Sequence, residues 1–114
     1  MADVLAEPYD YLELEDGESL EVRIQGFLEG ESVIRPRYEG APETKRIPCL
    51  RLYAAPGAKP IGAPWWDVTS KTLIARLRPH LKDLAASKGP FTVTAYGSGR
   101  RKRFSVEIPG PGAS

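Results

Sequence analysis

Residues 69–90 read TSKTLIARLRPHLKDLAASKGP and carry the clearest periodic signal in the chain. Apolar residues recur there at helical spacing and predict one helix with a single core-facing stripe, made of Leu73, Ile74, Leu77, Leu81, Leu84 and Ala85. A capping Thr69 or Ser70 before the stripe and Gly89 after it predict a helix over about residues 70–88.

Pro79 lies inside this helical pattern. Proline removes a backbone hydrogen bond from a helix at a cost of about 3 kcal/mol. We therefore expect either a kink or two short helices near Arg78. The apolar stripe stays in phase across the proline, which favours the kink.

Alternating apolar residues on both sides of the helix predict strands. Residues 19–29 form the first strand, with Leu20, Val22 and Ile24 on one side. Gly26 interrupts the alternation, as happens where a long strand bulges or turns a barrel corner. Strong curvature is expected there.

The next segment holds two prolines, two glycines and mixed charge, so residues 29–46 predict mostly loop, with residues 32–35 as an extension of a strand. Residues 47–54 form the second strand. Pro48 indicates an edge or a strand start, because proline cannot donate to a β-ladder. A Pro-rich loop then leads to the third strand, residues 65–68.

The last periodic stretch predicts a hairpin. Residues 91–96 and 103–108 both alternate between apolar and polar side chains, and Gly97-Ser98-Gly99 lies in the turn between them. Alternating runs on either side of a glycine-rich turn are typical of two antiparallel strands.

Length and the character of the termini define the expected organisation. The chain of 114 residues has the size of one domain. We expect an acidic, loosely ordered lead-in (residues 1–16), one domain (residues 17–109) and a flexible tail (residues 110–114). No apolar run approaches the roughly 20 residues that span a bilayer, and the acidic start does not resemble a secretion signal. We therefore expect no membrane partner and a cytoplasmic location.

The order of the elements, three strands, a helix and two strands, resembles the OB-fold. The resemblance covers about residues 17–109 and rests on that order, on the Gly26 interruption and on the position of the helix. It implies a mainly β protein: a small five-stranded Greek-key barrel with the helix between strands three and four. It also implies a ligand on the face of strands two and three, flanked by the loops after strands one and four.

Both loops carry cations: Arg35, Arg37, Lys45 and Arg46 with Tyr38 on the first, and Arg100, Arg101, Lys102 and Arg103 on the second. Between them the resemblance places Arg51 and Tyr53 on strand two, Trp65 on strand three and Tyr96 at the hairpin mouth. Cations that follow phosphates and aromatic faces that stack on bases, at about 1–3 kcal/mol each, hold single-stranded nucleic acid. We therefore expect a protein that binds single-stranded nucleic acid, DNA favoured, with low sequence specificity.

Charge is sorted along the chain. Residues 1–31 hold ten acids and one base, whereas residues 32–114 hold fifteen bases and five acids. The formal net charge of +1 is therefore the sum of a charge of −9 on the first segment and +10 on the second. A strongly basic body attracts polyanions through its long-range field and through counterion release.

Plainer interpretations remain open for each feature. The cations of residues 100–103 contact a polyanion, contact a protein or the acidic segment, or form a solvated turn. Trp66 belongs to the core, whereas Trp65 is either an exposed platform or lies under the preceding loop. The helix cations Lys71, Arg78 and Lys82 are expected to be solvated.

A second function class assigns the charge to protein contacts. The acidic residues 1–31 of one copy would then dock on the basic surface of another copy, giving a homo-oligomer, or on a different partner. A third possibility has residues 1–18 compete with nucleic acid for the basic surface, in which case their deletion should tighten binding.

Catalytic and metal-binding patterns are missing from the sequence. His80 has no second metal ligand or catalytic partner. The single Cys49 is expected to be buried in a strand. We therefore expect no enzyme, no metal and no cofactor.

Overall fold

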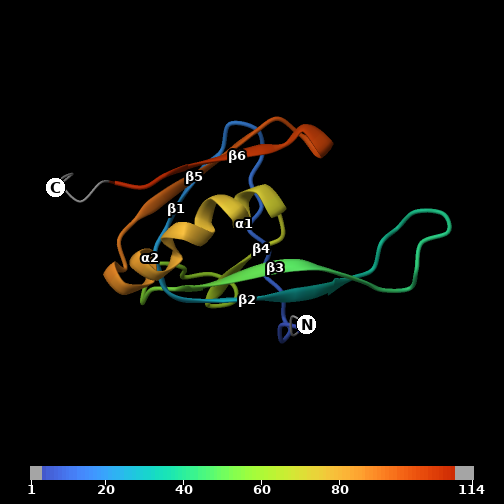
Figure 1. Ribbon diagram of the computed structural model, residues 1–114, viewed down its shortest axis with the longest axis horizontal. Helices are drawn as coiled ribbons and strands as arrows, with labels where there is room; N and C mark the ends of the chain where they lie inside the picture. Colours follow the sequence, from blue (N-terminus) through green and yellow to red (C-terminus); the bar gives the residue numbers. More distant parts are fainter. Residues whose placement is uncertain (1–3, 110–114) are drawn as a thin grey trace.

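Over the described residues, 4–109 without the side chain of Arg100, the computed structural model has six strands in two antiparallel sheets (Figure 1). One sheet has the order β1-β5-β6, from β1 (Ser19–Val22), β5 (Phe91–Tyr96) and β6 (Arg103–Glu107). The other has the order β2-β3-β4, from β2 (Ile24–Ile34), β3 (Lys45–Ala54) and β4 (Trp65–Val68). Helices α1 (Lys71–Leu77) and α2 (Leu81–Ser87) follow β4, with 3-10 turns η1 (Arg78–His80) and η2 (Gly99–Arg101). The protein is mainly β, and the tail predicted over residues 110–114 lies outside the described part.

The predicted closed barrel of five strands is wrong. The single strand expected over residues 19–29 divides at Arg23, whose carbonyl accepts a hydrogen bond from Ala55 N at 2.9 Å, so that β1 joins one sheet and β2 the other. The helices consequently follow the fourth strand instead of the third. Among the described strands, β4 pairs only with β3 and β6 only with β5, which leaves an open seam between β4 and β6.

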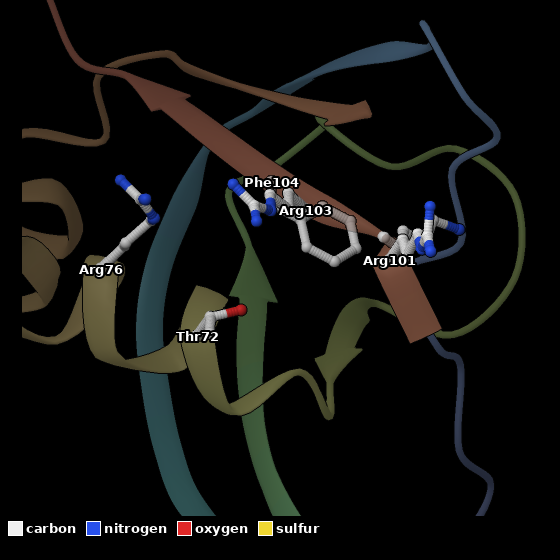
Figure 2. A pocket seen from close by; sticks show the side chains of 6 residues that line it. Thr72, Arg76, Arg101, Arg103 and Phe104 are labelled. Atoms are coloured by element: carbon white, nitrogen blue, oxygen red, sulfur yellow. The ribbon is translucent and has the colours of Figure 1, made fainter. Parts of the chain in front are cut away.

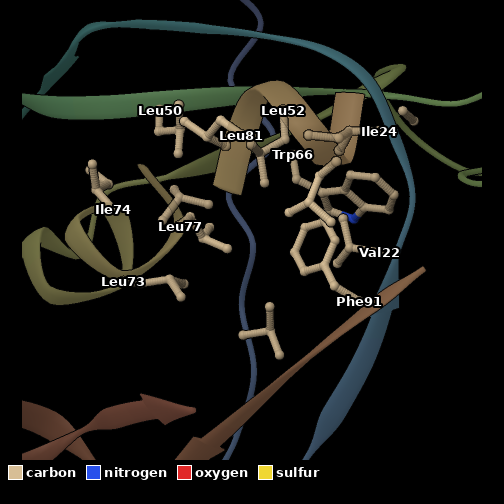
Figure 3. Close-up of a cluster of buried hydrophobic side chains, with 14 of the residues drawn as sticks. Val22, Ile24, Leu50, Leu52, Trp66, Leu73, Ile74, Leu77, Leu81 and Phe91 are labelled. Carbon is tan, nitrogen blue, oxygen red and sulfur yellow. The ribbon is translucent and has the colours of Figure 1, made fainter. Parts of the chain in front are cut away.

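The core fills the space between the two sheets and the helices (Figure 3). Leu50 and Leu52 of β3 and Val68 of β4 point into it, together with Trp66 of β4, which was predicted to belong to the core. Fully burying one large apolar side chain contributes about 1.5–3 kcal/mol. The apolar strand residues that are at most 1% exposed are Val22, Ile24, Leu50, Leu52, Phe91, Val93 and Ala95.

The helical segment follows the sequence pattern apart from its break. Ser70 caps α1 by accepting a hydrogen bond from Leu73 N at 3.3 Å. Pro79 lies in the 3-10 turn η1, so the segment consists of two short helices instead of the kinked helix that we favoured. The apolar stripe is nevertheless continuous, as predicted, because Leu73, Ile74, Leu77, Leu81 and Leu84 are all buried.

The hairpin of β5 and β6 is confirmed, with Ala95 opposite Phe104 and Tyr96 opposite Arg103. Its turn requires glycine at one position. Gly97 has a φ of +78°, and a Cβ there would lie 2.8 Å from the carbonyl oxygen of Arg101. Any other residue would therefore force the turn open.

The segment expected to be mostly loop, residues 29–46, is largely a projecting β-hairpin. The pairing of β2 with β3 continues to Ile34 opposite Lys45, so only residues 35–44 form the loop. Figure 1 shows this hairpin, here called the arm, extending away from the body, and the molecule with its arm measures 52 Å against 29 and 28 Å. Pro48 lies between the arm and Leu50, the first residue of β3 that pairs with β4.

The N-terminal segment is packed, in contrast to the loose lead-in that we expected. Leu5 N donates to Glu31 O at 2.8 Å, at the free edge of β2. Asp67 N donates to Asp10 O at 2.7 Å, and Leu12 N to Asp67 O at 2.8 Å, at the free edge of β4. Residues 4–12, here called the strap, therefore hold both edges of the β2-β3-β4 sheet and cross its outer face.

Candidate anion-binding groove

A hollow of about 860 Å³ lies between α1 and the start of β6 (Figure 2). We call it the basic groove. Its lining consists of Thr72 and Arg76 from α1 and of Arg101, Lys102, Arg103 and Phe104 from the hairpin turn and β6. No carboxylate lines it, and in the described part of the chain none of its four cations makes an ion pair.

Two elements bring these cations together. Arg76 lies on the exposed side of α1, since Leu73 and Leu77 occupy the buried side. Arg103 begins β6 with an exposed side chain, and Figure 2 shows it facing Arg76 across the groove, with Arg101 at the far end. Like charges that share an open hollow concentrate positive potential and attract anions.

Phe104 gives the groove an aromatic surface. Its side chain is half-buried, packs against the core and still lines the groove. The Lys102 ammonium lies 5.8 Å from the centroid of its ring. A phosphate held by the cations would therefore have an aromatic ring nearby on which a base could stack.

The aromatic residues predicted to form one binding face lie on two sheets. Tyr53 and Trp65 are cross-strand neighbours on β3 and β4, with ring centroids 6.2 Å apart in edge-to-face geometry, and both are half-buried. Tyr96 is 52% exposed but lies on β5, in the other sheet. The three rings therefore do not form a single platform.

Arg51, expected to contact phosphate, is an internal residue. It is 3% exposed, and its Nε donates to Asp67 Oδ1 at 2.8 Å. Its guanidinium carbon lies 4.3 Å from the ring centroid of Trp65 and 5.8 Å from that of Tyr9, and Nη2 donates to Pro8 O at 3.4 Å. The strap therefore covers part of the face that the resemblance assigned to a ligand.

Electrostatics around this buried pair follow from burial and from Asp67. Burial alone would lower the pKa of Arg51, but the hydrogen bonds and negative charge of Asp67 more than compensate, so the pKa is raised. Burial, with the negative charge of Asp67, raises the pKa of Cys49 to about 12. Cys49 is therefore a protonated, buried thiol, as its place in a strand suggested.

The arm carries the remaining predicted cations, away from the basic groove. Arg35, Arg37 and Lys45 are exposed, and Tyr38 is 60% exposed. Arg46 pairs with Glu31 at 3.7 Å. Residues 29–46 also hold four acids, Glu29, Glu31, Glu39 and Glu43, which equal their four bases in number. The arm is therefore neutral in total, and Figure 1 shows its tip apart from the turn at residues 97–103.

Of the predicted site residues, Arg101, Lys102 and Arg103 come together, and nothing is described for the side chain of Arg100. Sequence reasoning missed the other lining residues, Thr72, Arg76 and Phe104. The helical phase placed Arg76 on an exposed face, but nothing in the sequence indicated that this face meets the hairpin turn. The helix cations expected to be solvated, Lys71, Arg78 and Lys82, are all exposed, and Arg78 also pairs with Glu29 at 2.8 Å.

Comparisons with known proteins give no relatives: no family model, no curated protein and no solved structure matches the chain. No helix in the described part is long and apolar enough to cross a membrane. Within residues 4–109, no group of three or more His, Cys, Asp or Glu side chains could hold a metal ion.

Proposed function

We propose that the protein binds single-stranded nucleic acid through the basic groove, as a binding protein without catalysis of its own. The observation that carries the proposal is the convergence of Arg76 and Arg103, from two elements, on a hollow with no carboxylate in its lining. A repeating polyanion suits several cations in a row better than one small anion does, and Phe104 adds a ring for stacking.

Binding of a labelled single-stranded oligonucleotide at several salt concentrations, followed by fluorescence anisotropy, tests the proposal. Affinity should fall linearly with salt on a log–log scale, and each groove arginine that neutralises a phosphate should contribute about 0.7 to the slope. Arg76→Ala and Arg103→Ala should therefore weaken binding and flatten the slope. Lys82→Ala removes an equally exposed cation from α2, outside the groove, and should change neither. Absence of binding at low salt would refute the proposal.

A second candidate function, docking of a protein partner, is favoured by the free edge of β6. Ala95 N donates to Glu18 O and Ala95 O accepts from Gly17 N, so the backbone of Ala95 points toward β1. Residues opposite each other in an antiparallel pair either exchange both hydrogen bonds or exchange none, in alternation along the strands. Phe104 lies opposite Ala95, so its N–H and C=O groups point away from β5.

The same alternation directs the backbone of Val106 outward, and no described residue pairs with this edge. An extended acidic segment could add to it as a further strand, with its carboxylates near the groove cations. Such a segment would compete with nucleic acid for the groove.

A further inference from the structure

A second hollow adjoins the basic groove at the open seam between β4 and β6. Its volume is about 320 Å³, at the lower end of the roughly 300–1,000 Å³ that ligand pockets occupy. Lys102 and Phe104 line both hollows. The remaining lining comes from the N-terminal segment, from the end of β4, the start of α1 and the residues between them, and from the hairpin turn: Leu12, Glu13, Val68, Thr69, Ser70, Leu73 and Gly99.

The lining of this second hollow differs in chemistry from that of the groove. Val68 and Leu73 are at most 2% exposed, so the apolar side chains that a ligand could touch here are the half-buried Leu12 and Phe104. Its rim is polar, with the exposed carboxylate of Glu13 and the hydroxyl of Thr69. In ligand sites, apolar and aromatic side chains supply contact area, and a few polar groups fix the orientation of the ligand.

We propose that this second hollow is a nucleobase subsite, which takes one unpaired base while the groove cations hold the flanking phosphates. The inference rests on the proposed function and names the part of the ligand that the cations cannot recognise. The ring of the base would lie against Phe104 and Leu12. Glu13 can only accept hydrogen bonds when ionised, so it selects bases with an exocyclic amino group.

The subsite predicts both the strandedness and the base preference of the ligand. A base inside a duplex is stacked and paired, so it would have to leave the duplex at a cost of a few kcal/mol before it could enter. Cytosine and adenine carry an exocyclic amino group as a donor for Glu13, whereas the one donor on the pairing edge of thymine, N3–H, lies between two carbonyl oxygens, which a carboxylate repels.

The subsite also gives Glu13 a role in a strongly acidic segment. A carboxylate next to phosphate-binding cations lowers affinity for any polyanion, because it repels the backbone. A favourable contact with a base amino group would offset that repulsion for some bases and leave it unopposed for others. Glu13 would therefore act through discrimination between bases and not through affinity in general.

Competition binding with three homopolymers tests the subsite on the full chain. Oligo-dC, oligo-dA and oligo-dT of about 12 nucleotides, a length within the range of single-domain sites, displace one labelled oligonucleotide at fixed low salt. We expect dC and dA to bind about tenfold tighter than dT. Glu13→Gln should remove most of this preference, chiefly by raising affinity for dT, because the repulsion by Glu13 is offset by the amino contact only for dC and dA.

A matched control isolates the contact from the charge change. Glu15 is exposed, lies two residues after Glu13 and does not line the hollow. Glu15→Gln should therefore raise affinity for all three homopolymers by a similar factor and leave the preference for dC and dA intact. Circular dichroism spectra like that of the wild type show that both variants fold.

The outcomes separate the subsite from the proposed function. Equal binding of the three homopolymers by the wild type overturns the subsite, and so does an equal loss of preference in the two variants, while salt-dependent binding still supports the groove. Absence of binding by every homopolymer at low salt overturns the proposed function itself.

Discussion

The buried pair of Arg51 and Asp67 leads to the sharpest stability prediction. Asp67 is 1% exposed and accepts hydrogen bonds from Arg51 Nε at 2.8 Å and from Asp10 N at 2.8 Å. Asp67→Asn keeps the shape of the side chain but leaves the guanidinium charge buried without compensation. Breaking one side of a buried pair typically costs about 3–5 kcal/mol. A domain of this kind has a total stability of about 5–15 kcal/mol, so the variant should be marginally stable.

A surface pair with the same shortest N···O separation supplies the control. Arg78 Nη2 lies 2.8 Å from Glu29 Oε1, the same separation as in the buried pair, but the two side chains are 61% and 42% exposed. Glu29→Gln removes the same charge, and exposed pairs contribute only about 0–1 kcal/mol. Burial is therefore the main difference between the two substitutions.

Urea denaturation and thermal melting, both followed by circular dichroism, measure the difference. At about 4 °C per kcal/mol for a domain of this size, Asp67→Asn should lower Tm by about 12–20 °C and Glu29→Gln by less than about 4 °C. If Asp67→Asn fails to fold, the double substitution Arg51→Met with Asp67→Leu should restore much of the stability, because apolar side chains can replace a buried pair. Equal losses in Asp67→Asn and Glu29→Gln, or a double variant no more stable than Asp67→Asn, would refute the reasoning.

Three further predictions concern the strap, the buried thiol and the free edge. Removing residues 1–12 should lower the free energy of unfolding, because both edges of the β2-β3-β4 sheet lose their partners. Chemical denaturation measures the loss, and a truncated chain as stable as the full one would contradict this role of the strap. Cys49 should react with a thiol reagent at pH 8 only after unfolding. Because its folded pKa, about 12, exceeds the ordinary value of 9.0, the free energy of unfolding should fall as pH rises from 9 toward 12. The fall should be smaller in Cys49→Ala. Val106→Pro, compared with Val106→Ala, removes an outward N–H from β6 and should block an added acidic strand while oligonucleotide binding persists; equal peptide affinity in both variants, measured by calorimetry with a synthetic Glu-rich peptide, would refute strand addition.

Local periodicity predicted the elements whose side chains meet one core. The helical stripe, the hairpin of β5 and β6 and the inward position of Trp66 all follow from apolar residues at fixed spacing. The arm was missed because its strands project beyond the core, where backbone pairing holds them without an apolar stripe. Pro48 and the glycines of that segment indicate a loop by composition alone.

Closure of the sheets and the path of the strap could not be read from local patterns. Arg23 occupies a polar position in the alternation of apolar and polar residues, so the pattern predicts one continuous strand. The hydrogen bond from Ala55 N, a long-range contact, marks the division between β1 and β2. Acidic composition predicted a loose lead-in. The carboxylate of Asp10 nevertheless accepts hydrogen bonds from Lys59 Nζ and from Ala63 N, which are 49 and 53 residues later in the chain. Arg51 was assigned to a ligand because alternation placed it on an outer face, and the sequence did not reveal that the strap covers this face.

Ion pairs explain part of the uneven distribution of charge along the sequence. Four cations outside the basic groove pair with acids of the first 31 residues: Arg23 with Glu21, Arg46 with Glu31, Lys59 with Asp10 and Arg78 with Glu29. The groove cations have no such partner in the described part of the chain, and Glu13 is the only carboxylate that lines the adjoining hollow. The acidic segment thus neutralises positive charge elsewhere on the body, and the uncompensated charge stays where Arg76 meets the hairpin turn. A polyanion attracted by the field of the whole molecule would therefore be directed to this groove and not to the arm.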